Sequence, residues 1–194
     1  MHEVLDRNLF LVKEHVGIFK AANNYDIHDP ETGKVILECR EEKLGWWKIL
    51  RFTDFKRATP FHIQIRTPGG PDLIRVSRGW SFLRSTVPVH DGNGALLGSF
   101  RQKLLSIGGA FTVLDTDGSE LCRLKGKWTG WDFRFLSGER ELAHVTKKWS
   151  GLGKEMFTSA DNYVLEISDS VPAGFKLRKL IMAAVMCIDM VLKE

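Results

Sequence analysis

The sequence lacks the short motifs that mark most catalytic and metal sites. Its three cysteines, Cys39, Cys122 and Cys187, are scattered without a CxxC pair, which argues against a disulfide framework or a zinc site and favours a reducing compartment. The six histidines form no HExxH motif, no serine lies in a GxSxG elbow, and no glycine-rich stretch has the lysine of a phosphate loop. We therefore expect a protein that is not an enzyme and binds no metal.

Targeting and linker segments are also missing from the pattern. The first fifteen residues carry acidic side chains early and have no apolar core, so we expect no secretory signal and a cytoplasmic protein. No segment is rich in proline and serine, and 194 residues are enough for one sizeable core. The expected organisation is a single domain over residues 1–194. The net charge of +4 is compatible with an anionic partner.

The most distinctive stretch that is present runs from Phe175 to Glu194. Between Leu180 and Ile188 it contains no polar side chain, so a helix here is apolar on all sides and must be surrounded by lipid or by protein. A membrane span needs about 20 apolar residues, and the apolar run here is shorter. We therefore expect the helix to be surrounded by protein. We expect a helix that fills the core through Leu177, Leu180, Ile181, Ala184, Val185, Ile188 and Asp189.

The remainder of the chain is dominated by apolar segments that flank turns rich in Asp, Gly and Pro. Alternation is clear at Ile63 and Ile65, and it is the pattern of a half-buried strand. Hairpins are predicted at 25–40, 61–77, 87–102, 111–126 and 133–149, with further strands at 10–15, near 47–55 and at 162–168. About a dozen short strands predict a mainly β protein, either a barrel or a sandwich. A large barrel would have a lumen for the apolar helix.

The segment 145–167, VTKKWSGLGKEMFTSADNYVLEI, and the helix ending in CIDMVLKE resemble the phospholipid scramblase family. The hairpin sequences NNYDIHDPETGKVI, GSFRQK and DTDGSELCRLKGKW resemble the same family in order and spacing. That family is similar to the tubby C-terminal domain and to the LURP-one-related proteins. The resemblance implies a tubby C-terminal-like fold, which is a closed antiparallel barrel of about twelve strands around a buried C-terminal hydrophobic α-helix.

The resemblance also implies a calcium segment rich in Asp just before the terminal helix. Here Asp161 and Asp169 remain, but Pro172, Ala173 and Gly174 stand where the family has an acidic pair. Calcium requires six to eight oxygen ligands, so two carboxylates eight residues apart form a poor cage and no cofactor is expected. The alternative is that Asp161 and Asn162 form a turn before a strand.

Residues 40–57 form a candidate surface for anionic phospholipid. Six basic and three acidic residues alternate there with tryptophan and phenylalanine, a combination found at lipid headgroups. The candidates are Lys43, Trp46, Trp47, Lys48, Arg51, Lys56 and Arg57. The alternative is a pair of barrel strands with aromatic side chains inward and charges in water.

A second basic group comprises Arg123, Lys125 and Lys127, with Lys147 and Lys148 further along. The resemblance to tubby domains implies contact with phosphoinositide headgroups, whereas the alternative is that these charges lie on strand faces in water, as such charges usually do. No nucleic-acid-binding motif accompanies them. The expected function is a peripheral protein that binds phospholipid headgroups at the cytoplasmic face of a membrane. The alternatives are a cytosolic LURP-one-like interaction module with no lipid role and, third, phospholipid scramblase activity.

Overall fold

The computed structural model describes residues 2–14, 24–42, 60–79, 86–102, 111–127, 131–147 and 162–192. For Gln102, Lys127 and residues 188–192 it describes the backbone alone. The elements are a 3₁₀ helix, twelve strands and one α-helix. They are η1 (Glu3–Asp6), β1 (Leu9–Glu14), β2 (Tyr25–His28), β3 (Val35–Glu41), β4 (Phe61–Arg66), β5 (Asp72–Arg78), β6 (Thr86–Asp91), β7 (Leu96–Gln102), β8 (Phe111–Leu114), β9 (Glu120–Lys127), β10 (Asp132–Ser137), β11 (Arg140–Thr146), β12 (Asn162–Ile167) and α1 (Lys176–Leu192).

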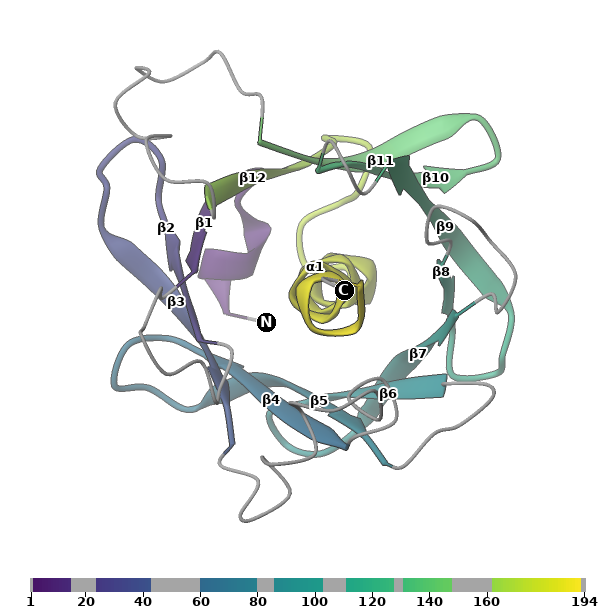
Figure 1. Cartoon of the computed structure of the whole chain (residues 1–194), viewed down its shortest axis with the longest axis horizontal. Helices are drawn as coiled ribbons and strands as arrows, with labels where there is room; N and C mark the ends of the chain where they lie inside the picture. Colours follow the sequence, from purple (N-terminus) through teal and green to yellow (C-terminus); the bar gives the residue numbers. More distant parts are fainter. Residues whose placement is uncertain are drawn as a thin grey trace.

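The strands form one closed antiparallel barrel, seen in cross-section in Figure 1. Each strand pairs with its neighbours in sequence, and β1 pairs with β12, with Leu9 opposite Glu166, to close the ring. The five predicted hairpins and the strands at both ends of the sheet are confirmed. The strand predicted near 47–55 lies outside the described residues. The predicted alternation of buried and exposed side chains is confirmed in β4, where Phe61, Ile63 and Ile65 are buried while His62 is exposed.

The antiparallel order gives the barrel two different ends. The short turns of the hairpins β2–β3, β4–β5, β6–β7, β8–β9 and β10–β11 lie at one end, together with η1 and the link from β12 to α1. We call this the turn end. The odd-numbered strands β1 to β11 all finish at the opposite end, which we call the loop end. Aspartates build the turns as predicted; the Asp91 carboxylate, for example, accepts hydrogen bonds from the backbone N–H groups of Asn93 and Ala95.

Helix α1 fills the lumen and runs from the turn end towards the loop end (Figure 1). The predicted core-filling residues Leu177, Leu180, Ile181, Ala184 and Val185 are all buried. Ile188 and Asp189 belong to α1, but their side chains lie outside the described part. Burying each large apolar side chain contributes roughly 1.5–3 kcal/mol, so the helix is a major part of the core. Among the described residues, no helix has the length and hydropathy needed to cross a membrane.

Arg178, beside the apolar run, is 3% exposed and fixes the start of α1 to the N-terminal segment. Its guanidinium donates hydrogen bonds to the carbonyl oxygens of Val171 at 2.7 and 3.0 Å and of Arg7 at 2.8 Å, and to the Asn8 side chain at 2.7 Å. Further bonds reach Pro172 and Asp6. Burial lowers the pKa of Arg178, and Asp6 and Asp169 partly offset that effect. One planar donor group thus ties together segments about 170 positions apart.

Gly98 of β7 lies where the barrel wall packs against α1. A Cβ atom at this position would lie 2.3 Å from the carbonyl oxygen of Leu114 and 3.2 Å from a Leu180 methyl group. We expect Gly98→Ala to lower the free energy of unfolding by roughly 1–3 kcal/mol through overpacking. The control is Gly79→Ala, since a Cβ at Gly79 meets nothing within 4 Å. Equal midpoints of urea unfolding for the two variants would contradict this expectation.

Replacing Arg178 should destabilise the protein far more than replacing the neighbouring lysine. Arg178→Met leaves several buried carbonyl oxygens without donors, so we expect a loss on the order of 3 kcal/mol. Lys179→Met is a matched control, because Lys179 makes no hydrogen bond or ion pair within the described part of the chain. Arg178→Lys should cause an intermediate loss of stability, because the lysine ammonium lacks the planar, forked donor group of arginine. Denaturant unfolding followed by circular dichroism measures all three; similar midpoints for both methionine variants would refute the role assigned to Arg178.

Candidate functional site

The first candidate surface lies largely outside the described residues. None of Lys43, Trp46, Trp47, Lys48, Arg51, Lys56 and Arg57 is described. The structure does describe where the chain leaves and re-enters the barrel. Strand β3 finishes at Glu41 and β4 begins at Phe61, and both positions are at the loop end. The lipid-binding role of these seven residues therefore stays a prediction.

The second basic group lies on the outer wall of the barrel. Cys122 and Leu124 of β9 point into the core, so Arg123 and Lys125 project outward and are exposed. The Arg123 Nε atom lies 2.6 Å from a carboxylate oxygen of Glu120, which offsets its charge. Lys127 is the last residue of β9, and its side chain is outside the described part. The wall therefore brings two of the three predicted cations together, one of them already paired.

Most other arginines on the wall are also paired with acidic side chains. The ion pairs are Arg40 with Asp26 at 2.6 Å, Arg66 with Glu38 at 3.3 Å, Arg75 with Asp72 at 2.9 Å and Arg134 with Glu141 at 3.0 Å. Exposed pairs of this kind contribute little to stability, typically about 0–1 kcal/mol. Their main effect is on the electrostatic field, because each one cancels a positive charge that could otherwise attract an anion.

The loop end holds an aromatic and cationic cluster that the residue pattern did not reveal. Trp131, between β9 and β10, stacks on Tyr163 with ring centroids 5.1 Å apart and meets Phe133 edge-on at 6.1 Å. The Lys147 Nζ atom lies 4.5 Å above the Trp131 ring, a cation–π arrangement. Trp131 has a φ of 48°, which is uncommon for a residue with a side chain. The cluster thus places an indole ring and a lysine side by side at the loop end.

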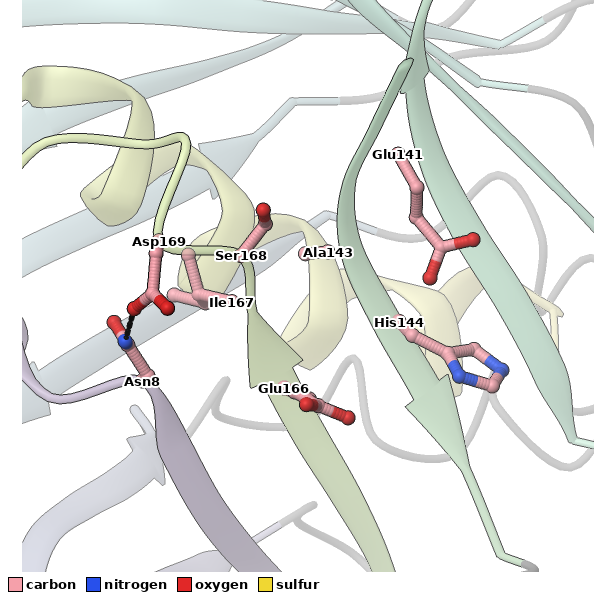
Figure 2. A pocket seen from close by; sticks show the side chains of 8 residues that line it. All are labelled: Asn8, Glu141, Ala143, His144, Glu166, Ile167, Ser168 and Asp169. Carbon is pink, nitrogen blue, oxygen red and sulfur yellow. Dashed lines mark hydrogen bonds between the residues drawn. The ribbon is translucent and has the colours of Figure 1, made fainter. Parts of the chain in front are cut away.

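A hollow of about 340 Å³ lies at the turn end between β11, β12 and Asn8, the residue before β1. Figure 2 shows its side chains, with the carboxylates of Glu141, Glu166 and Asp169 spread around the rim. Asp169 accepts a hydrogen bond from Asn8, and Glu141 is paired with Arg134. Asp161, the other calcium candidate, lies outside the described residues. Within the described ranges, no three His, Cys, Asp or Glu side chains are arranged to hold a metal ion.

The three cysteines are free and buried. Burial raises the pKa of Cys122 and of Cys187 to about 12. A thiol with so high a pKa is almost entirely protonated near neutral pH, and the thiolate is the reactive form. Cys122 and Cys187 are therefore inert packing residues in the folded protein.

Comparison with known proteins finds a similar yeast protein and a matching protein family. The chain is 22% identical over 187 residues to altered inheritance rate of mitochondria protein 25 of Saccharomyces cerevisiae (strain ATCC 204508 / S288c). The similarity covers 84% of this chain and 57% of the yeast protein, so the chain spans little more than half of that relative. No solved structure matches the chain.

The profile of the Scramblase family matches residues 8–194. This range contains all twelve strands and α1, and it includes the segment 145–167 on which the resemblance rests. Only the N-terminal residues that form η1 and its flanks fall outside it. The protein belongs to the scramblase family.

Proposed function

We propose that the protein binds anionic phospholipid headgroups at the cytoplasmic face of a membrane, as a peripheral protein that catalyses no reaction. Membership of the scramblase family supports a role connected with lipids. The observation that carries the proposal is at the loop end, where Trp131 and Lys147 are packed together and where the segment 42–60 joins β3 to β4. Tryptophan next to lysine and arginine suits the headgroup layer, which accommodates both an aromatic ring and a cation.

The proposal is limited to binding. The apolar surface of α1 is enclosed by the barrel, with Leu180, Ile181, Met182 and Ala183 each 0% exposed, so that surface is not available to acyl chains while the barrel is closed. The exposed wall is polar and largely charge-paired. Neither feature offers a route along which a headgroup could pass through the hydrocarbon core. We therefore do not extend the proposal to lipid movement between leaflets.

Sedimentation with vesicles tests the proposal. We expect the protein to sediment with vesicles that contain phosphatidylserine but not with vesicles of phosphatidylcholine alone, and to release as salt rises and screens the attraction. Replacing Lys48 with Ala should weaken binding about fivefold, since one cation near an anionic surface contributes on the order of 1 kcal/mol. Trp46→Ala combined with Trp47→Ala should weaken binding further. Calcium should leave the result unchanged.

Phe175→Ala is the matched control for the tryptophan variants. Phe175 is the most exposed large apolar side chain among those described, at 52%, and it lies at the turn end; its loss should not change sedimentation. Failure to bind either kind of vesicle would refute the proposal and favour an interaction module without a lipid role. Exchange of labelled lipid between leaflets of reconstituted vesicles would instead show scramblase activity.

A further inference from the structure

The positive charge of the barrel wall is concentrated on four consecutive strands. Strands β7 to β10 contain five basic and two acidic residues, whereas the other eight strands contain six basic and eight acidic residues. In the four strands the basic residues are Arg101, Arg123, Lys125, Lys127 and Arg134, and the acidic ones are Glu120 and Asp132. One part of the wall therefore differs in charge from the rest of the ring.

Strand register brings two of these cations to either side of a hydroxyl group. Arg101 of β7 is paired with Thr112 of β8, and Thr112 is paired with Arg123 of β9. Phe100 and Val113 are buried in the core, so the residues next to them point outward, as Arg123 does. Neighbouring strands are about 4.8 Å apart, which separates the Cα atoms of the two arginines by roughly 10 Å. We call Arg101, Thr112 and Arg123 the wall row.

The donor groups of the wall row are available to a ligand. The side chains of Arg101, Thr112 and Lys125 make no hydrogen bond or ion pair within the described part of the chain. Arg123 contacts Glu120 through its Nε atom, and this contact leaves the two terminal nitrogens of its guanidinium. An exposed ion pair contributes little to stability, so a phosphate group can compete with Glu120 for Arg123.

Strands β2 to β5 offer no comparable set of donors among their described side chains. Arg40, Arg66 and Arg75 are held in ion pairs with carboxylates. The remaining arginine of these strands, Arg78, is buried at 5% exposure. The four strands contain no lysine. The unpaired cations thus distinguish one side of the barrel from another.

Most acidic groups near the wall row lie towards the turn end. Asp91 at the end of β6 and the turn residues Asp115 and Asp117 are at that end. Asp115 is also paired with Lys176 of α1, which offsets its charge. The wall row is nearer to the loop end, since Thr112 is only the second residue of β8. The turn acids therefore leave the positive charge of the row largely intact.

The wall row is close to the aromatic and cationic cluster at the loop end. Lys125 is the next outward residue of β9 after the row. Trp131 comes directly before β10, which starts at Asp132 opposite the last residue of β9. Lys147 lies over the Trp131 ring, and Asp132 is hydrogen-bonded to His144. Described cations and an indole ring are thus brought together on the same side of the barrel.

We propose that the wall row and Lys125 bind the phosphate groups of an anionic bilayer, so that the wall formed by β7, β8 and β9 is the face that meets the headgroups (Figure 1). This inference rests on the proposed function and specifies the binding face. A guanidinium donates two parallel hydrogen bonds to phosphate oxygens. Two arginines on either side of a hydroxyl can therefore hold one phosphate from opposite sides. Family membership and the adjacent Trp131 favour a bilayer as the source of that phosphate.

Matched charge reversals test which side of the barrel binds. Arg101→Glu and Lys13→Glu change the net charge equally, but Lys13 is on β1, five strands from β8 around the ring. Neither side chain has a partner within the described part. On phosphatidylserine vesicles we expect Arg101→Glu to weaken binding roughly 30-fold, about fivefold for each unit of charge, and Lys13→Glu to have little effect. Equal weakening would show that net charge alone governs binding and would overturn the proposed face.

Thr112→Val tests for a phosphate site at constant charge. The valine keeps the approximate shape of threonine and removes its hydroxyl, so we expect binding to phosphatidylserine vesicles to weaken about fivefold. Unchanged binding would indicate diffuse electrostatic attraction and contradict the site. Binding of glycerophosphoserine at the row, without binding of vesicles, would assign the row to a soluble phosphate and likewise refute docking on a bilayer.

Site-specific labels locate the face directly. The native cysteines are buried, so a cysteine introduced at the surface can be labelled selectively with a fluorophore. Ser99→Cys places the label on the outside of β7, and His62→Cys places it at an exposed position of β4. With nitroxide-labelled headgroups we expect strong quenching at 99 and little at 62; equal or reversed quenching would overturn the face and leave the proposed function standing. Absence of vesicle binding by the unaltered protein would refute the proposed function itself.

Discussion

The structure depends on mutual burial between an apolar helix and the barrel that surrounds it. A closed ring of twelve strands encloses more space than its own side chains fill, and a helix that is apolar on all sides has no stable place in water. Neither the barrel nor the helix can bury its apolar surface without the other. Helix α1 occupies the lumen, Gly98 allows the wall to approach it, and Arg178 fixes its start against the N-terminal segment. Every polar function is consequently left to the outer surface.

The residue pattern was sufficient to predict most of the fold. Alternation along strands such as β4, aspartate-rich turns and the uninterrupted apolar run of Leu180–Ile188 are local signals, and the structure confirms the strands, turns and helix that they predict. The role of Arg178 could not be found in this way. In the sequence, an arginine beside an apolar run is what an ordinary helix boundary would also show. Its partners at residues 6–8 become neighbours only when the barrel closes. Nor did any periodic signal indicate η1, whose Val4 and Leu5 are buried against the core.

The candidate surfaces were less predictable because charge in a sequence does not reveal its partner. Arg123 and Arg134 are conspicuous cations in the sequence, yet each lies beside a carboxylate in the folded protein. Nothing in the sequence singled out Trp131, because the ring that it stacks on, Tyr163 of β12, is far from it along the chain. What composition could not show without topology is which connections share an end of the barrel. Once the strand order is known, the turn aspartates Asp29, Asp115 and Asp117 fall together at the turn end.

The pairing of β1 with β12 and the contact of Arg178 with residues 6–8 have a consequence for biosynthesis. The first strand and the N-terminal segment emerge from the ribosome long before α1 is made, so neither the ring nor its filling helix can form until all twelve strands have been translated. Until then, apolar faces and unpaired strand edges stay exposed to solvent. Contacts over such sequence separations also slow folding. A protein with this topology is expected to be most vulnerable to aggregation during and just after its own synthesis.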